Sequence, residues 1–287
     1  MLAPNLTPFE DDGRIAETLY VEHAKRLLDE GCAGLIPFGT TGEAASVGND
    51  ERIRMLDRLV EAGIPASRLM PGTGLTSLLD TVRLTRHAVE AGCLGVLVLP
   101  PFYYKAVSDD GLFAYFARLI EDVGEGALRI VLYHIPQVAG VGLSVPLVRR
   151  LREAFPETVV GIKDSSGDWA NTSALLEIEG LSVYPGTELL MPQALAAGSP
   201  GCITATANVN AAALARLAQL IYDDPGTVTG AFEPVRQVRL AVQQHPPISA
   251  LKAILAHRTG DDRWRNARPP LVPLSNDQRA ALERRSC

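Results

Sequence analysis

The chain has 287 residues, 47% of them hydrophobic, and a formal net charge of −6, so it has the length of one large domain or two ordinary ones. It contains no run of basic residues, which argues against nucleic acid as a partner. It also lacks the roughly 18 consecutive apolar residues of a membrane span and the N-terminal pattern of a signal peptide, so we expect a cytoplasmic protein.

Short apolar runs alternate with amphipathic stretches along the first three quarters of the chain. The runs, which we interpret as buried strands of a parallel sheet, cover about residues 2–7, 34–38, 68–72, 95–99, 129–133, 159–162, 181–184 and 201–204. The stretches between them have apolar residues at helical spacing and cover residues 16–30, 50–61, 77–90, 109–122, 144–154, 168–178, 188–197 and 210–222. Several helices begin at a capping residue, namely Asn49 or Asp50, Ser77, Ser108 or Asp109, and Ser144.

Eight strand–helix units in succession predict an α/β fold of the (β/α)8 TIM barrel type. The alternative is a doubly wound open sheet, but the Gly-rich dinucleotide loop that usually follows its first strand is absent. An Asp-Asp-Pro-Gly segment at 223–226 then predicts a break. We therefore expect a barrel catalytic domain at residues 1–222 and a C-terminal helical extension at 223–287. The extension carries helical patterns at 229–244, 247–258 and 277–285.

The cysteines and histidines show no metal-binding spacing. The four cysteines form no close pair, and the five histidines form no H-x-x-x-H pattern. Cys32, Cys93 and Cys202 follow glycines next to apolar runs, and we interpret them as buried free thiols. We therefore expect no metal site.

Lys163 directly follows the apolar run Val-Val-Gly-Ile, where a buried strand is predicted to end. Burial disfavours the charged form of a lysine. A lysine with a lowered pKa can attack a carbonyl carbon and form a Schiff base. The alternative is a lysine that reaches the surface at the end of its strand.

Hydroxyl-bearing residues follow other predicted strands, and barrel active sites lie at the carboxyl ends of the strands. Thr40 and Thr41 follow the second strand in a Gly-Thr-Thr-Gly-Glu turn, which suits a carboxylate or another anion. Tyr133 ends the fifth strand, and Tyr103 lies in an aromatic loop after the fourth. The alternatives are packed aromatic rings and ordinary turn residues.

Together these groups match Schiff-base chemistry on a 2-keto acid. Lys163 attacks the ketone, and the Thr40–Thr41 turn holds the substrate carboxylate. Tyr133 moves protons to and from the carbinolamine, and Tyr103 or the next residue passes them onward through Thr41.

Three neighbouring polar residues are expected to be structural. His134 and Asp164 follow Tyr133 and Lys163 in strand alternation, so their side chains should point away from the barrel interior. Glu43 follows the threonine turn and is expected to brace the loop.

The chain resembles the dihydrodipicolinate synthase / N-acetylneuraminate lyase family of pyruvate-dependent class I aldolases. The motifs that carry the resemblance are G-T-T-G-E at 39–43, Y-x-I-P at 133–136 and G-I-K-D at 161–164. The resemblance extends from Thr7-Pro8-Phe9 to Arg268-Pro269-Pro270-Leu271. It implies a (β/α)8 barrel with a C-terminal helical extension, a homotetramer built as a dimer of dimers, and no cofactor.

The resemblance also implies roles for individual residues. Lys163 is the Schiff-base lysine and Tyr133 the general acid/base. Thr40 and Thr41 bind the keto-acid carboxylate, and Thr41 also joins the proton relay. Tyr103, with Tyr104 just beside it, matches the tyrosine that completes the relay across a dimer interface. The backbone of two further residues lines the pyruvate site, and these are Gly186 and Ile203.

The chain departs from the family pattern at two places. The synthases place an arginine for the second substrate's carboxylate where this chain has Val138, which cannot form a bidentate pair. The sialic acid lyases hold their substrate's tail with an acidic pair, which here is reduced to Glu188 and Leu189. Ser165 and Glu188 are then expected to contact the hydroxyls of a shorter sugar acid.

We therefore expect a Schiff-base lyase or aldolase that releases pyruvate from a 2-keto acid or condenses it with an aldehyde. The expected substrate is a 2-keto-3-deoxy sugar acid such as 2-keto-3-deoxygluconate. One alternative is a 4-hydroxy-tetrahydrodipicolinate synthase that condenses pyruvate with aspartate semialdehyde. The others are a dehydratase of the same family and a catalytically silent keto-acid sensor.

Overall fold

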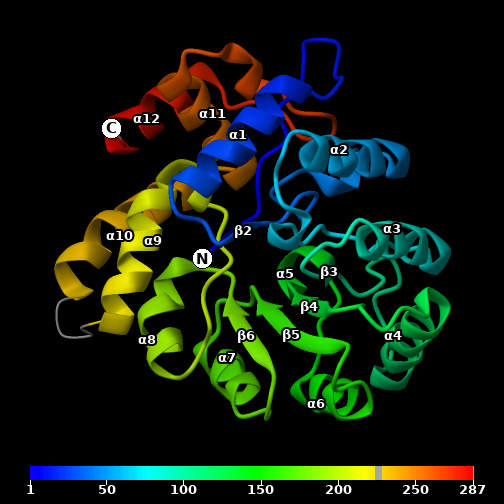
Figure 1. Ribbon diagram of the computed structural model, residues 1–287. Coiled ribbons are helices and arrows are strands. Elements are labelled where there is room, and N and C mark those ends of the chain that lie inside the picture. Colours follow the sequence, from blue (N-terminus) through cyan, green and yellow to red (C-terminus); the bar gives the residue numbers. More distant parts are fainter. Residues whose placement is uncertain (224–227, 287) are drawn as a thin grey trace.

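The structure, a computed structural model, describes residues 1–223 and 228–286 (Figure 1). The strands are β1 (Leu2–Ala3), β2 (Gly34–Leu35), β3 (Val96–Val98), β4 (Ile130–His134), β5 (Val159–Asp164) and β6 (Ser182–Pro185). The helices are α1 (Glu17–Asp29), α2 (Asn49–Glu61), α3 (Leu78–Glu90), α4 (Asp109–Val123), α5 (Pro136–Ala139), α6 (Val145–Ala154), α7 (Trp169–Leu176), α8 (Met191–Ala196), α9 (Ala207–Asp223), α10 (Val228–Gln243), α11 (Pro247–Thr259) and α12 (Asn276–Ser286). Most of the predicted break at 223–226, and Cys287, lie outside the described residues.

The parallel strands close into a ring in chain order. β1 pairs with β2, and β3, β4, β5 and β6 form a four-stranded sheet. Single parallel bridges extend the ring, from Leu35 to Leu69, from Gly72 to Leu97 and from Leu2 to Ile203. The Ile203 N–H donates to the Pro185 carbonyl at 3.1 Å and joins β6 to the segment that contacts β1. The predicted strands at 68–72 and 201–204 are therefore present as isolated bridges rather than as full strands. The predicted (β/α)8 barrel is confirmed.

Most predicted helices appear within a few residues of their expected bounds. Ser77, Ser108 and Ser144 each accept a hydrogen bond at the start of their helix, as predicted. The predicted cap of α2 was wrong, because the helix begins one residue after Gly48, whose N–H donates to Glu51 at 3.0 Å. The short α5, which has proline in its first turn, was not predicted.

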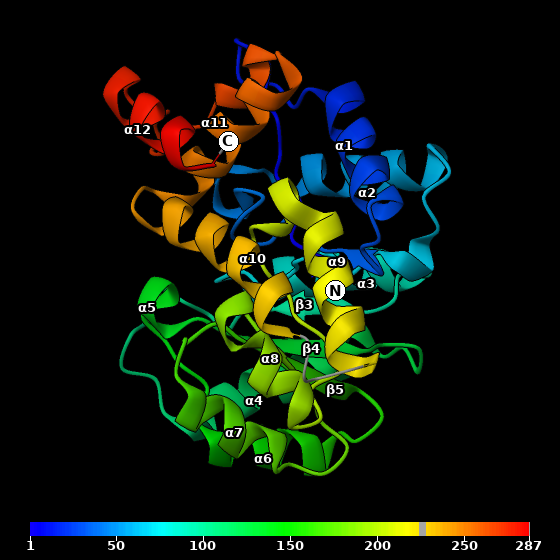
Figure 2. The ribbon, with the colours of Figure 1, turned by 90° about the vertical axis from the view of Figure 1, so that its left-hand side faces the viewer.

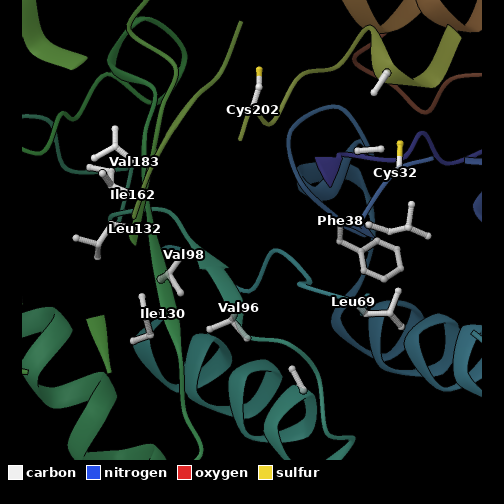
Figure 3. Packing of buried hydrophobic residues seen from close by; sticks show 14 of the residues in the cluster. Cys32, Phe38, Leu69, Val96, Val98, Ile130, Leu132, Ile162, Val183 and Cys202 are labelled. Carbon is white, nitrogen blue, oxygen red and sulfur yellow. The ribbon is translucent and has the colours of Figure 1, made fainter. Parts of the chain in front are cut away.

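Side chains alternate between two sides of the strands. Val96, Val98, Ile130, Leu132, Ile162 and Val183 belong to the core between strands and helices (Figure 3). Their neighbours Leu97, Val131 and Tyr133 pack instead with Ile203 in the barrel interior. This period of two decides which strand residues face the interior.

The C-terminal helices pack against the N-terminal part of the chain, as Figures 1 and 2 show for α1 and α11. Leu6, Leu19 and Trp264 share one hydrophobic cluster with α11, whose residues from Ser249 to Ala256 are all buried. The extension is therefore joined to the barrel by a continuous core. The division of the chain at residue 222 stays a prediction.

Other sequence expectations concern the cysteines and the membrane. Cys32 and Cys202 are buried free thiols, whereas Cys93 is only half-buried. Burial raises the pKa of the Cys32 thiol to about 11. Within residues 1–223 and 228–286, no helix is both long enough and apolar enough to span a bilayer.

Candidate active site

Lys163 and Tyr133 lie side by side in the barrel interior. They are register partners on β5 and β4, so both side chains point to the same side of the sheet. Lys163 is buried, with 5% of its surface exposed, and its Nζ donates to the Tyr133 Oη at 3.2 Å. The same Nζ lies 4.3 Å from the centre of the Tyr133 ring. The predicted burial of Lys163 is confirmed.

The threonine turn contacts this pair through Thr40. The Thr40 hydroxyl lies 3.4 Å from the Tyr133 Oη. The turn is bounded by Phe38 and Glu43, which both adopt a left-handed backbone with φ of 56°. Thr7 Oγ1 donates to the Gly42 carbonyl at 2.8 Å and ties the turn to the N-terminal segment. Thr40, rather than Thr41, is thus the threonine that the fold brings to the phenol.

The surroundings of Tyr133 lower the pKa of its phenol. Burial acts to raise this pKa, because it disfavours the phenolate. The Lys163 charge and hydrogen bonds from Thr40, Lys163 and Ser165 outweigh burial and hold the pKa below its ordinary value. A phenol with a lowered pKa exchanges its proton more readily near neutral pH, which suits proton transfer.

Ser165, Gly186 and Ile203 lie around the same pair. The Gly186 N–H donates to the Asp164 carbonyl at 2.6 Å. A Cβ at Gly186 would lie 2.0 Å from the Ser165 Oγ, so only glycine allows this close approach. Ile203 is fully buried in the interior cluster that contains Tyr133. The fold therefore gathers these three predicted residues at one end of the barrel.

His134 and Asp164 point to the helix layer, as strand alternation predicts. His134 Nδ1 accepts from the Leu143 N–H at 2.9 Å, and burial lowers the pKa of its imidazole. Asp164 accepts from Thr172 at 2.7 Å and from Asn171 at 3.0 Å, both on α7. Neither side chain is directed at Lys163.

The structure corrects the expectation for Glu188. Its carboxylate is fully buried and accepts hydrogen bonds from Thr204 Oγ1, at 2.5 Å, and from Thr206 Oγ1. Arg239 of α10 lies 3.8 Å from it. The segment Glu188–Leu190 is a 3-10 turn that directs this side chain into the protein. We therefore do not assign Glu188 to substrate.

Tyr103 and Tyr104 form an exposed aromatic pair. Their exposed fractions are 73% and 71%, and their ring centres lie 5.5 Å apart in an edge-to-face arrangement. Neither ring lines the cavity next to Tyr133. Within a single chain, Tyr103 therefore does not extend the Lys163–Tyr133–Thr40 cluster.

A cavity of about 390 Å³ opens beside Thr40 and Tyr133. Lys163 does not line this cavity, but its Nζ donates to Tyr133, which does line it. The C-terminal extension contributes part of the wall, through Ile248, Pro270 and Leu271. Sequence reasoning missed these residues, because no local pattern distinguishes them from core residues.

A buried ion pair connects the threonine turn to the C-terminal extension. Glu43 pairs with Lys252 of α11, and their side chains are at most 1% exposed. The Arg268 N–H also donates to Glu43, at 3.2 Å, and Lys252 donates to the Asn266 carbonyl at 2.6 Å. Glu43 is thus placed as a brace, as the sequence predicts. Lys252 was missed, although a lysine inside an otherwise apolar helix is a detectable signal.

We expect Lys252→Met to lower the free energy of unfolding by about 3–5 kcal/mol, because it leaves the Glu43 carboxylate buried without its cation. Chemical denaturation measures this loss. Lys25→Met at an exposed lysine is the matched control and should change little. The double variant Glu43→Gln/Lys252→Met should recover much of the stability. Equal losses in Lys252→Met and Lys25→Met would contradict this role.

Comparison with known proteins identifies close relatives over nearly the whole chain. The family model described as the dihydrodipicolinate synthetase family matches residues 1–285. An uncharacterized DapA-like lyase of Chloroflexus aurantiacus is 36% identical in an alignment that covers 98% of this chain and 94% of that protein. A 4-hydroxy-tetrahydrodipicolinate synthase of Methanothrix thermoacetophila is 30% identical over 96% of this chain and 92% of its own.

The fold is also similar to that of solved structures. The crystal structure of dihydrodipicolinate synthase from Agrobacterium tumefaciens superimposes with a TM-score of 0.91. Its sequence is 37% identical, and the superposition covers 98% of this chain and 96% of that one. The agreement in both sequence and fold extends through the C-terminal extension.

Proposed function

The chain belongs to the dihydrodipicolinate synthetase family and is a class I lyase of the aldolase type, and from this premise we propose that Lys163 forms a Schiff base with pyruvate or a larger 2-keto acid. The observation that supports this most is the buried contact of Lys163 Nζ with Tyr133 Oη at 3.2 Å. A lysine held beside a proton carrier in the barrel interior is what carbinolamine formation requires.

The proposed reaction begins when the neutral Lys163 amine attacks the keto carbon and forms a carbinolamine. Tyr133 delivers the proton with which the carbinolamine oxygen leaves as water, and an iminium remains. In cleavage, Tyr133 then takes the proton from the substrate's C4 hydroxyl. The C3–C4 bond breaks, an aldehyde leaves, and the electron pair moves to the iminium nitrogen as an enamine. Protonation at C3 and hydrolysis then release pyruvate and the free lysine.

The contacts favour Thr40 as the relay neighbour of Tyr133, in place of the Thr41 that the resemblance implies, because Thr40 lies 3.4 Å from the phenol. Thr41 then remains the candidate for the substrate carboxylate, on the same turn. Ser165 and the backbone of Gly186 and Ile203 complete the pyruvate site in this proposal.

We keep the proposed homotetramer, in which Tyr103 of a neighbouring chain completes the relay. The support is the exposed pair of Tyr103 and Tyr104, since large exposed aromatic groups are frequent in interfaces. A monomeric mass in sedimentation equilibrium would contradict this assembly. A cytoplasmic location stays a prediction from composition.

The test is reduction of the protein with borohydride in the presence of pyruvate, followed by intact mass measurement and peptide mapping. We expect one reduced pyruvate adduct, on Lys163, because only a Schiff base is trapped in this way. Lys163→Arg should lose the adduct, whereas Lys25→Arg, at an exposed lysine, should keep it. A folded protein without any adduct contradicts the proposal and favours a sensor or another bound fragment.

A further inference from the structure

The walls of the cavity beside Tyr133 are mostly apolar. Aliphatic and aromatic side chains from distant parts of the chain meet there, namely Leu75, Leu97, Leu99, Phe102, Ile135, Val138, Ile248 and Leu271. The hydroxyls in the described wall come from Thr40, Ser46 and Tyr133. Two of these three belong to the catalytic contact, so little remains to bind the hydroxyls of a sugar chain.

The two charged residues in the wall already have partners within the protein. Glu43 pairs with Lys252. Arg52 is 5% exposed and donates to the Val47 carbonyl at 3.2 Å and to the Ala44 carbonyl. Burial lowers the pKa of the Arg52 guanidinium to about 10, so it stays charged at neutral pH while it holds this backbone segment. Both charges therefore act to brace the loop after Thr41.

Val138 marks the outer side of the cavity. It follows Tyr133 by five residues, on the short helix α5, and 63% of its surface is exposed. An apolar side chain at this place offers no charge to a polar aldehyde. Together with Phe102 and Leu271, it adds apolar surface to the wall of the cavity.

We propose that this cavity binds an apolar body, aliphatic or aromatic, on the aldehyde that Lys163 joins to pyruvate or splits from it. The inference rests on the proposed Schiff-base function and replaces the sugar chain expected from the sequence. A volume of about 390 Å³ lies within the ordinary range for small-ligand pockets. Each methylene buried there favours binding by about fourfold, whereas a hydroxyl buried without a partner disfavours it.

The first experiment compares kcat/KM for condensation of saturating pyruvate with three aldehydes, namely benzaldehyde, D-glyceraldehyde and 4-carboxybenzaldehyde. We expect benzaldehyde to exceed both others by about tenfold or more, in line with burial of several apolar carbons. A preference for D-glyceraldehyde overturns the inference in favour of a sugar acid. A preference for 4-carboxybenzaldehyde overturns it in favour of an anion held by Arg52.

A pair of variants tests the cavity itself. Val138→Arg should lower kcat/KM for benzaldehyde about tenfold and raise the relative rate with 4-carboxybenzaldehyde, because it places a cation in the apolar wall. Val272→Arg is the matched control, since Val272 is 69% exposed and does not line the cavity. An aldehyde preference that Val138→Arg leaves unchanged contradicts the proposed binding site.

Borohydride trapping with pyruvate alone separates the two proposals. Absence of an adduct on Lys163 means that the Schiff-base function fails, and the inference fails with it. An adduct together with no turnover of benzaldehyde, or with equal turnover of all three aldehydes, leaves the Schiff-base function standing and contradicts only the apolar substrate.

Discussion

Lys163→Arg is expected to abolish turnover, with a fall in kcat on the order of 10⁴-fold or more, as for the loss of other catalytic nucleophiles. Arginine retains the positive charge and similar bulk beside Tyr133 but does not deprotonate in proteins, so it cannot attack a carbonyl carbon. Steady-state kinetics of pyruvate release or consumption measure this loss.

The control for this variant is Lys25→Arg, which makes the same exchange at an exposed lysine and should leave kcat unchanged. Thermal unfolding of both variants shows whether the fold is intact. Appreciable turnover by a folded Lys163→Arg protein would mean that the reaction proceeds without a Schiff base at this position.

Tyr133→Phe is expected to lower kcat by between about 100- and 10,000-fold, the usual contribution of a positioned acid or base. The substitution removes the hydroxyl that contacts Lys163 at 3.2 Å and Thr40 at 3.4 Å, while the ring still fills its place in the interior cluster. Lys163 remains, so borohydride should still trap an adduct, but at a much lower rate. Stopped-time trapping and steady-state kinetics check the two effects separately.

Tyr115→Phe is the matched control for this substitution. The Tyr115 hydroxyl contacts Thr81 at 2.9 Å and the Leu75 carbonyl at 3.2 Å. Its loss should reduce stability slightly and leave kcat near the wild-type value. If Tyr133→Phe were as active as Tyr115→Phe, the phenol would have no part in the proposed proton transfer, and Thr40 would have no relay partner.

Residue order along the chain was enough to predict the barrel and its central pair. The period-two alternation of β4 and β5 places Tyr133 and Lys163 on the interior side and His134 and Asp164 on the helix side. Parallel strands that follow one another also tend to be neighbours. Because β4 and β5 are adjacent and both side chains point to the barrel interior, Tyr133 and Lys163 come into contact.

The expectation for Glu188 failed because its partners come from elsewhere in the chain. Thr204 and Thr206 lie at least 16 residues away in sequence, and their hydroxyls donate hydrogen bonds to the Glu188 carboxylate. The sequence could not decide either whether Thr40 or Thr41 contacts the Tyr133 phenol. It depends on the left-handed backbone at Phe38 and Glu43, which orients the turn between them.

The sequence by itself determined the strand–helix order, the interior position of Lys163 and Tyr133, and the family of the protein, because each depends on local periodicity or on short motifs. Only the tertiary structure decided which charges are neutralised inside the protein and what lines the cavity. The pairing of Glu43 with Lys252, and the wall formed by Ile248 and Leu271, depend on the C-terminal helices folding back onto the barrel. Such contacts join residues about 200 positions apart, and no local pattern specifies them.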